Sequence, residues 1–304
     1  DVIRVITPGT VIESNMLDEK KNNYIMSIFK SGLFFGLAVC DVSTGDFYAT
    51  ELKDTNNFSR LLDEIARYTP SEIVVNDLMF SSNEEIEKIK ERFQCYISKL
   101  SDEKFNEETA KISKEYKIIN NNDEEVQNLE NNLWALNAIS ELVFYLKDTQ
   151  KTKMEHVNKI KIYSTTKYMS LDINARRNLE ITEKMRDKSK KGTLLWVLDK
   201  TCTSMGGRNL RRWLNNPLVN TVEINERLDA VSELKENMIL KGEIIESLKK
   251  VYDIERLIGK ISYGNANARD MISLKNSIKQ IPDIKKLLVS TQSNLLKALY
   301  KNEE

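Results

Sequence analysis

The sequence predicts a multidomain protein in which an α/β domain is followed by an all-α domain. The nearly continuous apolar run 33–41 has the length and composition of a strand buried on both faces. A turn at 43–46 and a returning apolar stretch at 47–50 follow it, which is typical of a hairpin. From Asp172 onward, apolar residues recur at helical spacing. The 304 residues are enough for two domains of ordinary size.

The first hundred residues alternate short apolar stretches with helical patterns, which predicts a mixed sheet with helices packed on it. The expected strands, besides the hairpin, are 2–6, 23–29, 72–76 and 95–100. The turn sequence Thr7–Thr10 ends the first of them. One helix is expected over 58–66, ending before Pro70, and a second is expected with Asn83 as its N-cap.

The run Asn120–Asp123 separates the α/β part from a long helical pattern that begins at Val126 and includes Leu129. The pattern predicts a helix of about 25 residues, roughly 37 Å long, and this length favours a connecting helix. We therefore expect a first domain over 1–119, a linking helix within 120–153 and a helical domain over 154–304. The start of the last segment is irregular, with a short strand expected over 160–163.

The second half predicts a series of amphipathic helices. One covers 208–214 and must end before Pro217. Asn220 and Glu223 have the spacing of a capping box at the start of the next helix. The expected inward-facing residues of that helix are Ile224, Leu228, Val231 and Leu234.

The composition describes a globular protein, because 40% of the residues are apolar and 30% are charged. No apolar run reaches the roughly 18 residues of a membrane span. The three cysteines lie far apart in sequence, which fits reduced thiols. The chain begins at Asp1 without an initiator methionine, so we expect a piece of a longer protein.

The zero net charge conceals an asymmetry between the two halves. Residues 1–153 carry about 18 basic and 27 acidic side chains, a net charge of about −9, and residues 154–304 carry about +9. The basic half could lie near a polyanion, or its charges could be solvated faces.

No catalytic, metal or nucleotide site is predicted in this chain. It lacks the GxxxxGK[ST] loop that cradles phosphates and has no CxxC pair for zinc. His156 is the only histidine, so neither a His-based metal site nor a Ser-His-Asp triad is expected. We therefore expect no cofactor to be bound by these residues.

Carboxylates near strand ends leave one enzymatic alternative open. Asp41, Asp46 and Asp77 could hold two divalent metals for phosphodiester cleavage if they converged. The competing interpretation is that Asp41 and Asp46 stabilise the turn between two strands.

Basic residues of the second half are candidates for DNA proximity. They are Lys190, Lys191, Arg208, Arg211 and Arg212. The three arginines lie at i, i+3 and i+4 and can share one helix face, where they would neutralise phosphates. The alternative is a solvated face or ion pairs to neighbouring helices.

Several segments resemble the MutS family, in family order along nearly the whole chain. TPGT at 7–10, GLAVCDVSTGDFY at 36–48 and TPSEI at 69–73 are similar to its connector domain, and YLKDTQK at 145–151 resembles the end of the helix that follows. YMSLDINARRNLEIT at 168–182 resembles the opening of the family's core domain. GTLLWVLDKTCTSMGGRNLRRWLNNPL at 192–218 is the strongest match, and INERLDAVSEL and DIERLIGKISYGNANARD extend it to Asp270.

The resemblance implies a ribonuclease-H-like connector followed by a helical core/lever bundle. It also implies a cytoplasmic, nucleoid-associated DNA mismatch repair protein that forms homodimers on DNA, uses ATP with Mg and recruits MutL, with the connector as part of the MutL contact surface. The core would relay conformational change between the DNA-binding and ATPase ends. We expect Asn120–Asp123 to permit reorientation of connector and core.

The chain departs from the family pattern because the mismatch-reading, clamp and ATPase segments are not in it. No mismatch-reading or nucleotide-binding residue of the family can therefore be carried onto a position here. The resemblance favours a non-catalytic fragment. A MutS relative that binds recombination intermediates, and a ribonuclease-H-like nuclease, stay open as alternatives.

Overall fold

The computed structural model describes residues 4–55, 58–104, 109, 112, 114–120, 132–152 and 154–301. The chain divides into two compact units. Unit 1 comprises Asp1–Thr166, Ser170–Glu180 and Ile258–Asn265, and unit 2 comprises Lys167–Met169, Ile181–Leu257 and Ala266–Glu304. The sequence predicted boundaries at 119 and 153, whereas unit 1 continues beyond both, because its sheet recruits a strand from 159–162.

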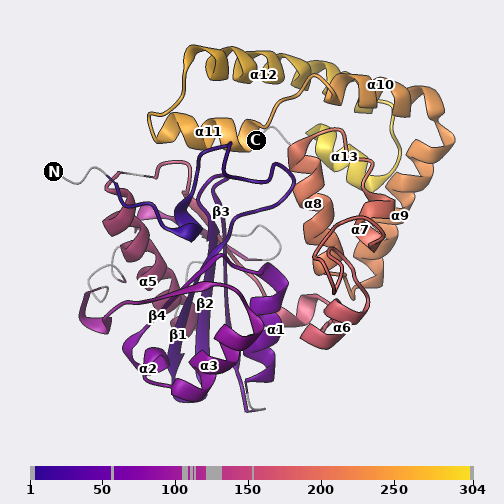
Figure 1. Ribbon diagram of the computed structural model, residues 1–304. Coiled ribbons are helices and arrows are strands. Elements are labelled where there is room, and N and C mark those ends of the chain that lie inside the picture. The colour runs from indigo at the N-terminus through magenta and orange to yellow at the C-terminus, as the bar shows by residue number, and fades with distance from the viewer. Residues whose placement is uncertain are drawn as a thin grey trace. The chain divides into compact units, whose positions relative to one another are not determined.

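Within the described residues, unit 1 is built on a seven-stranded mixed sheet in the order β5-β4-β1-β2-β3-β7-β6 (Figure 1). The strands are β1 (Ile25–Ser31), β2 (Phe34–Asp41), β3 (Asp46–Lys53), β4 (Glu72–Val75), β5 (Tyr96–Lys99), β6 (Lys117–Ile119) and β7 (Lys159–Ile162). β2 pairs antiparallel with β1 and β3, and the other pairs are parallel. The predicted hairpin is confirmed, and β2 is buried along all but its first residue.

Two expectations for unit 1 are wrong. Arg4–Thr7 form no strand; instead the Val5 amide donates to the Thr149 carbonyl, so this segment is held by a helix end rather than by the sheet. Val2 and Ile3 lie outside the described residues. Asn83 is the first residue of its helix and not the cap: the N-cap is Ser82, which makes no side-chain capping bond.

The helices of unit 1 cover both faces of the sheet, with α1 and α5 on opposite sides (Figure 1). The α-helices are α1 (Ser59–Tyr68), α2 (Asp77–Phe80), α3 (Asn83–Arg92), α5 (Leu133–Gln150) and α6 (Ile173–Asn178). Short 3-10 turns lie at Pro8–Thr10, Asp102–Lys104 and Thr165–Lys167.

The described part of the long helix is a packed core helix, not the separate connector that its expected length favoured. Ala135, Ala138, Ile139 and Leu142 of α5 are fully buried and join the apolar cluster of the sheet. The helix approaches so closely at Gly36 of β2 that a Cβ there would overlap the Trp134 carbonyl. The expected hinge residues 121–123, and Val126 and Leu129, lie outside the described residues.

The regular structure described in unit 2 is helical apart from one isolated bridge between Tyr168 and Leu218, as the pattern after Asp172 predicts. Its helices are α7 (Leu194–Leu198), α8 (Ser204–Asn215), α9 (Thr221–Glu236), α10 (Met238–Leu248), α12 (Ala268–Leu288) and α13 (Asn294–Lys301), and α11 (Ile254–Ser262) begins in unit 2 and ends in unit 1. Within 4–301, and leaving the undescribed gaps aside, no helix combines the length and apolar character needed to cross a bilayer.

The start of α9 is partly as expected. The Asn220 side chain caps the helix by accepting from the Val222 amide, but no reciprocal bond from Glu223 completes a capping box. Leu228 and Val231, expected to face inward, are 58% and 62% exposed, because α9 buries itself mainly through Ala230 against α13. The helical period was right, and Leu234 does pack against this cluster, but Leu228 and Val231 do not face inward.

Candidate functional site

The basic residues proposed for DNA proximity occupy different environments in unit 2. Lys190 forms an ion pair with Asp199, whose side chain is almost wholly buried. Lys191, the next residue, is exposed. The pair at Lys190 fixes the loop that leads into α7, since Asp199 also accepts from the Thr201 amide and hydroxyl. Lys191 therefore keeps the more accessible charge of the two.

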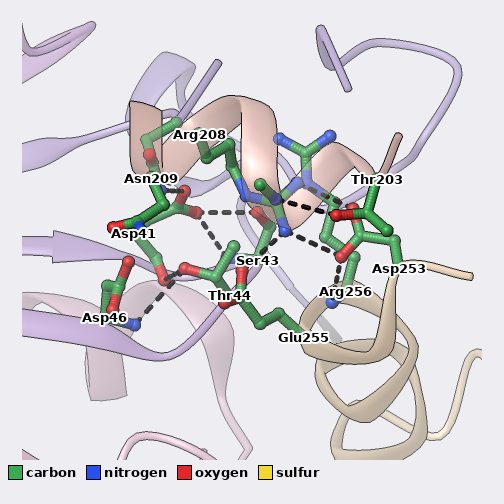
Figure 2. A network of polar contacts seen from close by, with 12 residues as sticks. Asp41, Ser43, Thr44, Asp46, Thr203, Arg208, Asn209, Asp253, Glu255 and Arg256 are labelled. Atoms are coloured by element: carbon green, nitrogen blue, oxygen red, sulfur yellow. Dashed lines mark hydrogen bonds and ion pairs between the residues drawn. The ribbon is translucent and has the colours of Figure 1, made fainter. Parts of the chain in front are cut away.

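The Arg208 guanidinium joins α8 to the start of α11 (Figure 2). Nη1 and Nη2 each lie 2.7 Å from an oxygen of Asp253, and Nη2 also lies 2.6 Å from Glu255 Oε2. This bidentate geometry is the strongest form of carboxylate recognition by arginine. Burial opposes the charge, but the bonds to Asp253 and Glu255 outweigh it and raise the pKa of Arg208. The guanidinium is thus already engaged by two carboxylates.

Two further arginines of α8 also make contacts within unit 2. Arg211 lies 3.5 Å from Glu183 Oε1, and Arg212 Nη2 donates to Asn209 Oδ1 at 2.8 Å. Ion pairs to neighbouring segments, the second interpretation of the sequence, are thus present at Lys190, Arg208 and Arg211. A role of these residues near DNA stays a prediction.

The Asp41 carboxylate, at the end of β2, organises the turn into β3 (Figure 2). Its Oδ1 accepts from the Ser43 amide at 2.9 Å and the Ser43 hydroxyl at 2.7 Å. Its Oδ2 accepts from Asn22 Nδ2 at 2.8 Å and the Asn23 amide at 3.2 Å. Four donors saturate this buried carboxylate, which fits the turn interpretation.

The carboxylates considered for metal binding do not converge. Asp41 and Asp46 face each other across the β2–β3 pair. Asp77 follows β4 at the other end of the sheet, about six residues or roughly 20 Å along the strand direction. There it pairs with Lys99 at 2.8 Å and accepts from the Asp102 amide. These three residues therefore cannot form a two-metal site, which needs ions about 4 Å apart.

Residues 7–10 are held by a buried glutamate that the sequence analysis passed over as the first residue of a strand. Glu72 Oε2 accepts from the Thr7 hydroxyl at 2.5 Å and the Gly9 amide at 3.0 Å. Its Oε1 accepts from Tyr145 at 2.5 Å and Ser98 at 3.2 Å. Burial and the bond to Glu72 raise the pKa of Tyr145 to about 12. The sequence did contain a signal for this buried carboxylate, because a charged residue begins the otherwise apolar strand 72–75.

A second buried carboxyl was also missed. Glu141 of α5 is fully buried and accepts from the Ser27 hydroxyl of β1 at 2.7 Å. Burial raises its pKa well above the usual value, and the Ser27 bond offsets this only in part. Burial in the sheet–helix core therefore disfavours the charged form of this side chain. Its position on the buried face of a helix was a visible signal of an unusual environment.

The sequence has no phosphate-binding loop, and among the described residues no three His, Cys, Asp or Glu side chains are placed to hold a metal ion. The buried carboxylates Asp41 and Glu72 each accept from four donors of their own unit. The hydrogen bonds of these carboxylates fix loops and helix ends.

Two family models match the chain in succession. The model of MutS domain II matches residues 23–160, and that of MutS domain III matches residues 174–303. Together they include β1–β6, the first half of β7 and the helices α7–α13.

Curated relatives agree with these matches. The chain is 50% identical to the DNA mismatch repair protein MutS of Ruminiclostridium cellulolyticum over 98% of its own length. It is 48% identical to that of Acetivibrio thermocellus over 97% and 41% identical to that of Clostridium tetani over 99%. It spans about a third of the length of these relatives (33–34%). The chain therefore belongs to the MutS family of DNA mismatch repair proteins, of which it comprises domains II and III.

Proposed function

We propose that this chain is a non-catalytic part of a MutS-type protein that recognises and repairs DNA mismatches. In this proposal the sheet of unit 1 is the ribonuclease-H-like connector, and unit 2 is the beginning of the core/lever bundle. The parent protein would be a cytoplasmic homodimer that binds DNA and uses ATP with Mg at sites outside these two domains. The chain would relay conformational change between the DNA-binding and ATPase ends.

The observation that supports a relay is where the buried charges lie. Glu72 joins residues 7–9 to β5 and α5, and Arg208 joins α8 to α11. Each of these two charged side chains fixes secondary structure elements to one another instead of facing an open site. Packed elements locked in this way shift between discrete arrangements rather than deform continuously. Such a unit is suited to transmitting movement.

An exposed apolar patch on unit 1 supports a MutL contact surface. Leu78 and Phe80 of α2 are 47% and 43% exposed. Lys99 of β5 lies 5.4 Å from the Phe80 ring centroid, which brings the helix and the edge strand together. Exposed aromatic and aliphatic groups beside a cation are typical of protein-binding surfaces.

Purified MutL tests this surface. The double variant Leu78→Ser/Phe80→Ser should weaken MutL binding at least tenfold, as measured by surface plasmon resonance. Leu33→Ser is the matched control, because Leu33 is 56% exposed in the same unit but lies at the β1–β2 turn. Equal affinities for the double variant and the control would remove the patch from the proposal.

Repair in living cells tests the function itself. The aligned third of the Ruminiclostridium cellulolyticum MutS is replaced by this chain, and the spontaneous mutation frequency is measured in cells lacking MutS. The chimera should lower the frequency close to the value given by the intact relative. A chimera that is expressed and soluble yet leaves the frequency at the empty-vector level would contradict the proposed function.

A further inference from the structure

A short loop of unit 2, residues 184–191, carries a dense positive charge and leads into α7. Its eight residues include five basic side chains and one acidic side chain, a net charge of +4. The basic residues of this segment, the basic loop, are Lys184, Arg186, Lys188, Lys190 and Lys191. Side chains of like charge repel one another, so the segment would spread apart unless other contacts held it together.

Backbone hydrogen bonds give the basic loop a fixed shape. The Lys184 amide donates to the Ser189 carbonyl at 3.0 Å, and the Lys188 amide donates to the Lys184 carbonyl at 3.1 Å. Lys188 adopts a left-handed backbone conformation with φ 53°, which a lysine holds only where its surroundings impose it. At the end of the loop, Thr193 donates its amide and its hydroxyl to the Lys190 carbonyl, at 3.2 and 2.7 Å. The positive charges are therefore presented on an ordered backbone.

Two of the five basic side chains combine exposure with freedom from internal partners. Lys190 pairs with Asp199, and the one acid of the loop, Asp187, accepts from the Ser189 amide at 3.0 Å. Arg186 and Lys191 are exposed. Among the residues that the structure describes, none makes a hydrogen bond or an ion pair with either of these two side chains. Their charges are available to a ligand.

The arginines of α8 do not offer comparable charge. The Arg208 side chain is only 3% exposed and is held by both Asp253 and Glu255. Arg211 lies 3.5 Å from Glu183. To neutralise a phosphate, Arg208 would first have to break a bidentate pair with a carboxylate. Within unit 2, the basic loop is therefore better placed to meet a polyanion than the arginine face that the sequence suggested.

We propose that the basic loop contacts the phosphate backbone of duplex DNA through Arg186 and Lys191. The inference rests on the proposed function and names residues through which this part of the protein meets DNA. Phosphate contacts require accessible cations in a fixed arrangement and no groups that read bases, and the loop supplies both cations. A protein partner would require an apolar centre, whereas Met185 is the one apolar residue of the loop.

The salt dependence of DNA binding by the complete chain counts these contacts. For duplex DNA, each phosphate that a protein neutralises contributes about −0.9 to the slope of log K against log salt concentration. The double variant Arg186→Gln/Lys191→Gln should therefore make this slope less negative by about 1.8. The measurement is a fluorescence anisotropy titration of a labelled duplex, repeated over a range of salt concentrations.

Two further variants serve as controls. Arg269→Gln/Lys275→Gln also removes one arginine and one lysine, both exposed on α12 of the same unit, and should leave the slope unchanged. Arg186→Lys/Lys191→Arg keeps both charges of the loop and exchanges their side chains. It should keep the slope of the unmodified chain, because counterion release depends on charge.

A less negative slope in Arg186→Gln/Lys191→Gln, with the slope kept in both controls, supports the loop contact. An unchanged slope in that variant, an equal change in the α12 control, or a loss of slope in the charge-conserving variant overturns it. Equal losses of binding to poly-glutamate and to DNA also overturn it, since they assign the loop to acidic proteins. If the loop contact fails while the repair chimera described above restores repair, the proposed function stands and DNA is met elsewhere.

Discussion

Loss of the Glu72 carboxylate should destabilise unit 1 strongly. The carboxylate is fully buried and accepts four hydrogen bonds, from Thr7, Gly9, Ser98 and Tyr145. In Glu72→Ala, three of these donors are hydroxyls that can find other partners: Thr7 already lies 3.0 Å from the Thr10 hydroxyl, and Ser98 lies 3.4 Å from the Tyr145 hydroxyl. The Gly9 amide has no such alternative in the loop.

The size of the destabilisation follows from this difference between the three hydroxyls and the Gly9 amide. Bonds to a charged group contribute about 1.5–3 kcal/mol each, and a buried donor left without a partner costs about 1–3 kcal/mol. With partial rescue of the hydroxyls, Glu72→Ala should lower the free energy of unfolding by about 3–5 kcal/mol. For a unit of this size, that is a fall in Tm of about 10 °C.

Hydrogen exchange measures the effect in each unit separately. The β1 and β2 amides of unit 1 should lose protection in Glu72→Ala, while the α9 amides of unit 2 keep theirs. The β1 and β2 amides should lose less protection in Glu72→Gln, since the glutamine side chain retains one acceptor oxygen. A loss below about 1 kcal/mol in Glu72→Ala would refute the reasoning that this carboxylate holds residues 7–10 onto the sheet.

Three further outcomes are expected. Folding raises the pKa of Glu141, so the stability that Glu141 contributes is complete below its ordinary pKa of 4.5 and is lost as pH rises toward its pKa in the folded state. Urea titrations at a series of pH values should show this decline in the free energy of unfolding. The Glu141→Gln variant should show no such decline. Gly36→Ala should lower the free energy of unfolding by about 2–4 kcal/mol, since the new methyl overlaps the Trp134 carbonyl; a loss under 1 kcal/mol in thermal denaturation would contradict that packing. DNA binding by this chain should be weak and salt-sensitive, and Lys191→Gln should weaken it further in a fluorescence anisotropy titration; tight, mismatch-selective binding at physiological salt would refute this.

The strands and helices were largely predictable because their cause is local. The run 33–41 becomes β2, buried along nearly its whole length, and Asn220 caps α9 as its residue type predicts. The inward face of α9 was only partly predictable, because burial depends on which helix lies opposite: Leu234 packs with Ala230 as its spacing predicts, and Leu228 is left exposed.

The networks that organise the chain were not predictable, because their partners are distant in sequence. Glu72 meets Gly9 across 63 residues, and Arg208 meets Asp253 across 45. The spacing of Arg208, Arg211 and Arg212 correctly indicated a shared helix, but it contains no information about the carboxylates that approach it. The Asp41 turn was the exception, since Ser43 lies two residues away.

The central claim is that this part of a MutS protein transmits movement, and hydrogen exchange in the repair chimera tests it most directly. Exchange in the 41–47 segment of the chimera is measured with and without ATP. The relay predicts that ATP changes the exchange of this segment. Identical exchange of this segment in the presence and absence of ATP would contradict it.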